Sequence, residues 1–440
     1  MPWQETSPGH YERDFDSLER LYHTIADAGA PLNKQHFLIS TTLRLKTSPP
    51  PHQVLNAWKA LRQQYPQIAA AADETGTRFV YDVPSATELQ AWVDESFFLE
   101  EDGSAQEKYE KEQPSSLVRL FYFSASRELL FRTPHWRMDG IGIMHLQGAF
   151  IRILGNGPPD EIHFDGSETK NLSPSLDEAA NVPLAVTPAM SQAADEELEV
   201  YLQGLPAVSI STLPNVLPTT TRRVTSSFDV ETTSRIIHAC KSRGLTVTSG
   251  IDAAMILATL PYAERNFDPA TRGQGGGKYT AFNTINLRKY LPAPFNGPEA
   301  AVSIYHTGIP VREVCKRDFS MENPRNVFQF LAEYVHKVIG ILGTPPANPL
   351  HASAYPELSS IGIVNDYLPD IFKGSASVIE VEEWWIAVEV IDRLLRATLW
   401  TWNGQMHLSL NWNEAFYEDE FVHDFMNKWK ETVLRELAVI

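Results

Sequence analysis

The sequence is poor in cysteine, in positive charge and in long apolar runs. Its two cysteines, Cys240 and Cys315, are too few for a disulfide framework. No stretch approaches the roughly 18 to 20 consecutive apolar residues that a membrane-spanning helix needs, and residues 1–15 lack the apolar core of a signal peptide. With 37 Lys and Arg against 55 Asp and Glu, the net charge of −18 offers nucleic acid and anionic membranes no general attraction. We therefore expect a cytoplasmic protein that binds neither.

The signatures of several cofactors and nucleophiles are also missing. The glycine-rich residues 272–278 do not form a P-loop, because Tyr279 stands where a Ser or Thr must hold magnesium. Gly140 and Gly142 lack the third glycine of a dinucleotide fingerprint, which would fall on His145. The sequence has no GxSxG elbow, no HExxH motif and no cysteine pair for zinc. We therefore expect no bound metal.

Helices and strands are predicted in two units joined by a connector rich in Pro, Ser, Asp and Ala. Hydrophobic residues make up 43% of the chain, which is enough for two cores. We predict a first unit over residues 1–165, a connector over 166–221, and a second unit over 222–440, part of which is expected to cross over to the first. The hydrophobic periodicity predicts helices at 14–28, 52–65, 143–154, 195–203, 232–243, 248–260 and 417–434. It predicts strands at 37–45, 77–81, 118–124, 128–132, 224–230, 279–287, 359–364, 377–381, 385–391, 396–402 and 406–412. This pattern indicates an α+β fold with mostly antiparallel sheets.

The chemically most informative residues lie in a loop between a predicted strand and a predicted buried helix. His135, Asp139 and Gly140 form an HxxxDG motif there. A histidine can remove a proton near neutral pH, an aspartate turned inward can brace the loop that aims it, and Gly140 would let the backbone fold back tightly. The alternative is an ordinary loop histidine with Asp139 as the N-cap of the following helix.

The position of this motif and four further segments resemble one family. The motif follows a strand hairpin in the first third of the chain, and the other matching segments are 11–23, 282–297 with its Asn-Leu-Arg sequence, 359–368, and the tail from 402. Together they resemble the condensation-domain and BAHD superfamily of coenzyme A dependent acyltransferases, in particular the fungal branch typified by trichothecene O-acetyltransferases.

This resemblance implies two chloramphenicol-acetyltransferase-like subdomains, each a mixed sheet flanked by helices, with a tunnel at their interface. It implies that His135 is the general base for direct attack of an acceptor on an acyl thioester, and that Asp139 forms an ion pair with Arg288. Pro134 replaces the first histidine of the condensation branch, and the DFGWG string of the plant-type branch is absent. No carrier or adenylation module is attached, so the expected donor is free acyl-CoA, in the first place acetyl-CoA.

Acyl transfer also needs oxyanion donors, a site for the donor's phosphates and an acceptor pocket. Each set has an ordinary alternative, namely strand hydroxyls, solvated surface charges, and core aromatics. The candidate oxyanion donors are Ser359 and Ser360; the candidate phosphate ligands are Arg222, Arg223, Lys241, Arg243 and Lys278; the candidate pocket residues are Trp136, Tyr305, His306 and Trp384.

The leading hypothesis is a monomeric O-acyltransferase, acetyl-CoA dependent, that acts on a hydroxyl of a fungal-type secondary metabolite. A second hypothesis uses the same fold for a non-acyl reaction such as cyclisation. A third is a catalytically silent protein that binds a metabolite, and the intact HxxxDG motif counts against it.

Overall fold

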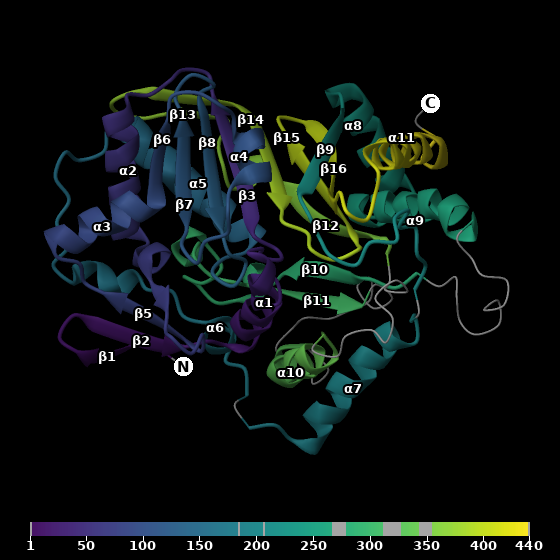
Figure 1. Ribbon diagram of the computed structural model, residues 1–440, viewed down its shortest axis with the longest axis horizontal. Helices are drawn as coiled ribbons and strands as arrows, with labels where there is room; N and C mark the ends of the chain where they lie inside the picture. Colours follow the sequence, from purple (N-terminus) through teal and green to yellow (C-terminus); the bar gives the residue numbers. More distant parts are fainter. Residues whose placement is uncertain are drawn as a thin grey trace.

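The computed structural model describes residues 2–183, 185–205, 207–265, 279–310, 327–342 and 354–438. The chain forms two halves, each with its own sheet, and further helices and strands lie below and between them in the view of Figure 1. The first half is built on a six-stranded sheet in the order β13-β14-β3-β8-β7-β6, and the second on a four-stranded sheet in the order β12-β15-β16-β9. The predicted α+β class is therefore confirmed, whereas the predicted tunnel and the exact unit boundaries stay predictions.

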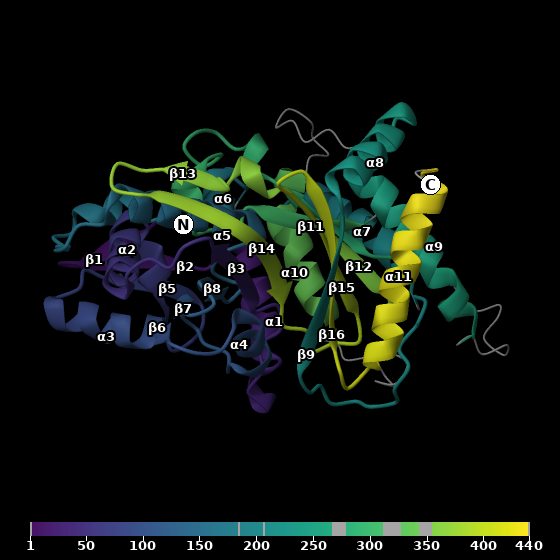
Figure 2. The ribbon, with the colours of Figure 1, turned by 90° about the horizontal axis from the view of Figure 1, so that it is seen from above.

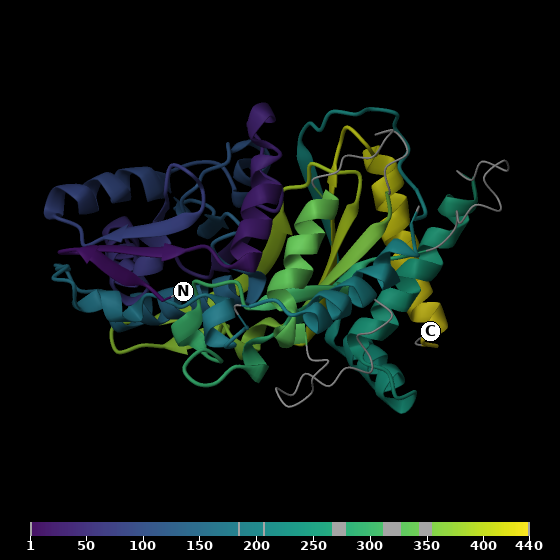
Figure 3. The same cartoon turned by 90° about the horizontal axis from the view of Figure 1, so that it is seen from below.

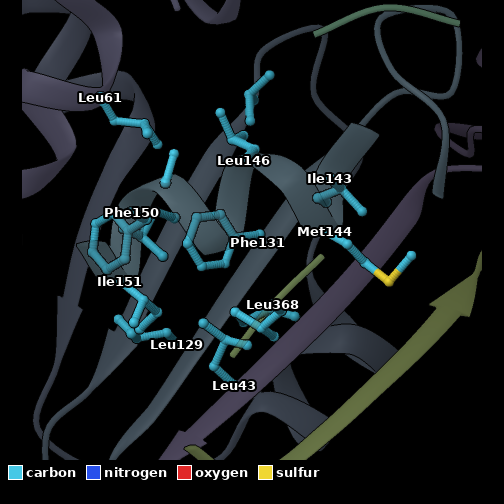
Figure 4. Close-up of a cluster of buried hydrophobic side chains, with 14 of the residues drawn as sticks. Leu43, Leu61, Leu129, Phe131, Ile143, Met144, Leu146, Phe150, Ile151 and Leu368 are labelled. Atoms are coloured by element: carbon cyan, nitrogen blue, oxygen red, sulfur yellow. The ribbon is translucent and has the colours of Figure 1, made fainter. Parts of the chain in front are cut away.

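The first half packs helices against its sheet. Its core strands and helices are β3 (Ile39–Leu45), β6 (Phe97–Glu100), β7 (Arg119–Phe123), β8 (Glu128–Thr133), α2 (Pro51–Gln64), α3 (Ala86–Ser96), α4 (Ala105–Lys111) and α5 (Gly140–Asn156). Apolar side chains of α5, such as Ile143 and Phe150, meet Leu61 of α2 and Phe131 of β8 in one buried cluster (Figure 4). This packing fixes α5, and with it the loop that precedes the helix.

Two strands of this sheet come from the far end of the chain. They are β13 (Ile371–Lys373) and β14 (Val378–Val388), and β14 pairs antiparallel with β3. Figure 2 shows β14 as a long strand that reaches from the second half along the first. The prediction of two strands at 377–381 and 385–391 was wrong. Glu382 and Glu383 are exposed and look like a turn in the sequence, but they mark only a shift in the pairing register of one continuous strand.

The second half consists of a twisted sheet with helices on one side. Its elements are β9 (Thr221–Phe228), β12 (Pro356–Ile363), β15 (Leu395–Trp402), β16 (Gln405–Asn413), α8 (Val230–Ser242), α9 (Val247–Arg265) and α11 (Asp419–Glu436). These strands and helices lie where the periodicity predicts them, apart from their ends. Among the described residues, no single helix is long and apolar enough to cross a membrane; the bent pair α8 and α9 meets that length and composition test only when taken together.

The helices and strands outside the two main sheets and their covering helices include most of the elements that the sequence did not predict. A small sheet holds β1 (Gln4–Ser7), β2 (His10–Asp14), β4 (Ala71–Ala72) and β5 (Arg78–Asp82), and a two-stranded ribbon holds β10 (Phe282–Asn286) and β11 (His306–Pro310). The helices are α1 (Ser17–Asp27), α6 (Leu176–Ala179), α7 (Pro188–Leu202) and α10 (Leu331–Leu342). Helix α10 packs between α1 and α7 (Figure 3). The predicted connector thus contributes α7 to a packed hydrophobic cluster, and its predicted helix at 195–203 covers only the second part of α7.

Candidate active site

His135 lies in the loop between β8 and α5, where three other segments meet it. Its half-buried ring stacks face to face on Tyr22 of α1, with ring centres 3.9 Å apart and planes 4° apart. The ring of Phe37, just before β3, lies 6.1 Å away, and that of His306 at the start of β11 lies 5.3 Å away. The motif histidine is thus held among aromatic rings from distant parts of the sequence.

The environment of His135 keeps its imidazole neutral. Burial, with a smaller contribution from the neighbouring His306, lowers the pKa of His135 to about 3. Its Nδ1 atom is buried and has no hydrogen-bond partner within the described part of the chain. A neutral imidazole has one nitrogen lone pair free to accept a proton, which is the state that a general base requires.

Asp139 forms the predicted ion pair with Arg288, which the structure therefore confirms. The Nη1 atom of Arg288 lies 3.0 and 2.8 Å from the two carboxylate oxygens, and the two side chains are only 2% and 4% exposed. The backbone N–H of Gly142 donates to the same carboxylate at 2.7 Å, so Asp139 is also the N-cap of α5. Burial alone would raise the pKa of Asp139, but Arg288 and these hydrogen bonds lower it to about 2.

The same carboxylate also holds the segment that leads into β11. The backbone N–H of Tyr305 donates to Asp139 at 2.8 Å, and the backbone N–H of Asp139 donates to the carbonyl of Ser303 at 3.1 Å. Arg288 completes the contact through Nη2, which lies 3.3 Å from the hydroxyl of Ser303. We call the group of Asp139, Gly142, Arg288, Ser303 and Tyr305 the Asp139 joint. It fastens the HxxxDG loop to the β10–β11 ribbon.

The glycine that the packing requires is Gly142, which corrects the role predicted for Gly140. Gly140 does not have a positive φ, and a Cβ added there would lie 3.3 Å from the side chain of Ile361 on β12, a tight contact with a movable group. A Cβ on Gly142 would lie 2.2 Å from the carbonyl oxygen of Ala301. Because backbone atoms cannot yield as a side chain can, only glycine allows α5 to approach this segment.

Three of the four candidate pocket residues lie in packed cores, which does not support a role in binding the acceptor. Trp136 is 2% exposed beside Phe15, and Tyr305 is fully buried, with its hydroxyl donating to the carbonyl of Pro174 at 2.8 Å. Trp384 is 3% exposed and donates to Gln147 at 3.0 Å. Trp385, on the opposite face of β14, is also buried, so neither tryptophan is free. His306 alone lies beside His135.

Two of the candidate phosphate ligands already have partners within the protein, which does not support a role for them in binding phosphate. Arg222 contacts Glu110 at 2.6 Å and Glu414 at 2.8 Å. The guanidinium of Arg223 lies over the ring of Trp385, 3.9 Å from its centre. These contacts tie β9 to the first half and engage both guanidinium groups.

The remaining candidates are the other predicted phosphate ligands and the two serines predicted to stabilise the oxyanion. Lys241 and Arg243 are exposed at the end of α8, where they could meet an anion, and Lys278 lies outside the described residues. Ser359 and Ser360 are half-buried on β12, and the hydroxyl of Ser360 lies 2.9 Å from that of Thr248 at the start of α9. Their part in the site stays a prediction.

The sequence did not single out Tyr22 and Phe37, the two aromatic side chains nearest to His135 besides His306. Tyr22 looks like one of the apolar positions of an amphipathic helix, and Phe37 looks like the first residue of a strand. Phe37 has a φ of 61°, a rare conformation for a bulky residue. Such backbone strain gathers at functional sites, but no sequence pattern marks it.

Comparison with known proteins finds similar sequences and solved structures of similar fold. No protein-family model matches the chain. The chain is 29% identical to acetyltransferase pigO of Monascus ruber, over 100% of this chain and 99% of that protein. Its fold matches the TRI3 trichothecene 15-O-acetyltransferase of Fusarium sporotrichioides with a TM-score of 0.78 at 18% identity, covering 99% and 97% of the two chains. It also matches the first condensation domain of the calcium-dependent antibiotic synthetase, with a TM-score of 0.58 at 13% identity and 95% coverage of both.

Proposed function

We propose that the chain, which is similar over its full length to an acetyltransferase and in fold to a trichothecene 15-O-acetyltransferase, transfers an acetyl group from acetyl-CoA to a hydroxyl of a small secondary metabolite. The observation that carries this proposal is the placement of His135, whose imidazole lies among the rings of Tyr22, Phe37 and His306 on a loop that the Asp139 joint fastens to the β10–β11 ribbon. A base of this kind needs no metal or covalent intermediate to activate an alcohol.

The proposed reaction is a direct transfer. The acceptor hydroxyl gives its proton to His135 while its oxygen forms a bond to the thioester carbonyl carbon. The carbonyl oxygen becomes an oxyanion, and the collapse of this intermediate breaks the C–S bond. The thiolate then takes the proton from the imidazolium, so that ester, free CoA and neutral His135 result. Asp139 does not take part in proton transfer, because its carboxylate is bound to Arg288 and to two backbone N–H groups.

The donor is proposed to approach from the second half of the molecule. A chain of contacts runs from the exposed end of α8 toward the motif: Thr248 follows Lys241 and Arg243 in sequence, its hydroxyl contacts Ser360 on β12, and Ile361 beside it lies next to Gly140. The two cations could bind the phosphates of CoA at the mouth of this route. Their exposure would make that contribution dependent on salt.

The acceptor is proposed to be a hydroxylated metabolite of fungal type. This part of the proposal rests on the names of similar proteins, an acetyltransferase and a trichothecene 15-O-acetyltransferase. The half-buried aromatic rings of Tyr22 and Phe37 around His135 would favour an apolar ring system next to the reacting hydroxyl.

The experiment is an assay of CoA release from acetyl-CoA with a panel of alcohols, including a trichothecene alcohol and polyketide-derived alcohols. Mass spectrometry of the acceptor should show one added acetyl group. His135→Ala should lower kcat by about 10²- to 10⁴-fold, whereas His163→Ala, an exposed histidine with 83% of its side chain accessible, should not. Full activity of the His135 variant, or no acetylated product from any alcohol, would refute the proposal.

A further inference from the structure

His306 is a buried histidine that makes no hydrogen bond within the described part of the chain. It is 7% exposed, and neither Nδ1 nor Nε2 has a partner. Buried polar side chains in folded proteins are nearly always hydrogen-bonded, and an exception calls for an explanation. An imidazole without a partner costs free energy in the folded state, so its presence beside His135 needs a reason.

His306 lies beside His135, the residue proposed to take the proton of the acceptor hydroxyl. Its ring centre lies 5.3 Å from that of His135 and 5.5 Å from that of Tyr22, on which His135 stacks. His306 directly follows Tyr305, whose backbone N–H donates to Asp139 at 2.8 Å. The Asp139 joint therefore sets the positions of both imidazoles, one on the loop before α5 and the other at the start of β11.

The chemistry of the second imidazole differs from that of the first. Burial lowers the pKa of His306, so this ring is neutral as well. A neutral imidazole carries one N–H donor and one acceptor nitrogen. Direct acyl transfer needs a base for the attacking hydroxyl and also a donor for the oxyanion that forms on the adjacent carbonyl, and these two oxygens lie on the same tetrahedral carbon.

We propose that His306 donates an N–H hydrogen bond to the carbonyl oxygen of the acyl thioester and stabilises the oxyanion. This inference rests on the proposed acetyl transfer. In the step, the acceptor oxygen forms its bond to the carbonyl carbon, the proton goes to His135, and the π electrons move to the oxygen that His306 holds. When the C–S bond breaks, the carbonyl is restored and the leaving thiolate takes the proton from His135. His306 keeps its own proton throughout.

Of the two serines predicted for this role from the sequence, Ser359 and Ser360, the second already has a hydrogen-bonding partner. The hydroxyl of Ser360 lies 2.9 Å from that of Thr248, and one of these two groups donates a hydrogen bond to the other. His306 has no such competitor, and it approaches His135 directly.

The test replaces His306 by Phe, which keeps the ring but removes the donor, and by Asn, which keeps an N–H donor. We expect His306→Phe to lower kcat by about 10²- to 10³-fold, the usual effect of losing one oxyanion donor, with the KM for the acceptor changed by less than about threefold. His306→Asn should recover at least about tenfold of that loss. The Tm of His306→Phe should equal or exceed that of the wild type, because the variant removes two buried atoms without partners.

His407→Phe is the matched control. His407 on β16 also has a buried Nε2 without a partner and stacks on an aromatic ring, that of Trp400, at 5.1 Å and 4°. The His407→Phe variant should also have a Tm at or above that of the wild type, because it removes a buried atom without a partner, and it should keep the wild-type kcat.

The outcomes separate this inference from the proposed function. Wild-type transfer that depends on His135 but is unchanged in His306→Phe overturns the inference alone. A loss of Tm that parallels the loss of kcat shows a structural role and also overturns it. If the wild type releases no CoA with any acceptor, the proposed function and the inference fall together.

Discussion

Among the ion pairs that join the first half of the molecule to elements beyond it, two differ mainly in burial. The pair of Asp139 and Arg288 is almost fully buried, with side-chain exposures of 4% and 2%. The pair of Glu110 and Arg222 joins α4 to β9, with exposures of 19% and 37%. Both have short contacts, so distance alone does not distinguish them.

Burial makes the first pair a cooperative joint and leaves the second an ordinary surface contact. In the Asp139 joint the carboxylate accepts from two backbone N–H groups as well as from Arg288, so removing one partner leaves a charge that water cannot reach. Around Arg222, water and the second carboxylate of Glu414 can replace a lost partner. The following predictions test this difference, from the largest expected effect to the smallest.

The largest effect is expected from Arg288→Met, which leaves the carboxylate of Asp139 buried and unpaired. The free energy of unfolding should fall by about 3–5 kcal/mol, measured by denaturant unfolding. Adding Asp139→Leu should restore part of this stability, because the double variant has no uncompensated charge. A loss below about 1 kcal/mol in the single variant would show that the joint behaves like a surface pair.

Gly142→Ala tests whether close backbone packing is part of the joint. The added Cβ would lie 2.2 Å from the carbonyl oxygen of Ala301, so α5 must move away, at a cost of about 1–3 kcal/mol. We also expect kcat to fall, because His135 precedes the displaced helix. Gly340→Ala is the control: that glycine has open space around its Cβ position and should tolerate the methyl group.

Acid should weaken the joint in a defined pH range. The pKa of Asp139 in the folded state is about 2, below its ordinary value of 3.8. A depressed carboxyl pKa stabilises the fold above the unfolded-state value, and this stability is lost as the pH falls from about 4 through 2. The shift corresponds to about 2 kcal/mol. The free energies of unfolding of the wild type and Asp139→Asn should therefore converge over this range; parallel curves would contradict the assignment.

Arg222→Met should have the smallest effect. Because Arg222 is more than one third exposed, we expect a loss of at most about 1 kcal/mol, which should shrink further in high salt. A loss as large as that of Arg288→Met would remove the distinction between the two pairs.

The sequence predicted the parts of the site that are encoded locally. HxxxDG places its histidine and aspartate on one short loop, and the Asn-Leu-Arg segment supplied Arg288 through the family resemblance. The sequence could not tell a pocket aromatic from a core aromatic. Trp136 directly follows His135 but packs on the opposite side against Phe15.

Residues brought together only by the fold were largely missed. Tyr22 and Phe37 carry no signal beyond their apolar character, and the pairing of Arg222 with Glu110 depends on how α4 meets β9. The strands and helices that the sequence did not predict were missed for the same reason, because their hydrophobic contacts arise only in the folded chain. The strand β1 is polar and exposed, β2 is polar and half-buried, and β11 and α10 acquire their hydrophobic surroundings from distant segments.

The position of β14 in the first half has a consequence for the synthesis of the protein. The strand β3 is paired on one side with β8 and on the other with β14. While the ribosome translates the roughly 330 residues between β3 and β14, one edge of β3 lacks its partner. An unpaired strand edge is a template for aggregation, so the nascent first half is vulnerable until residue 388 has emerged, and fragments that end before β14 should be poorly soluble.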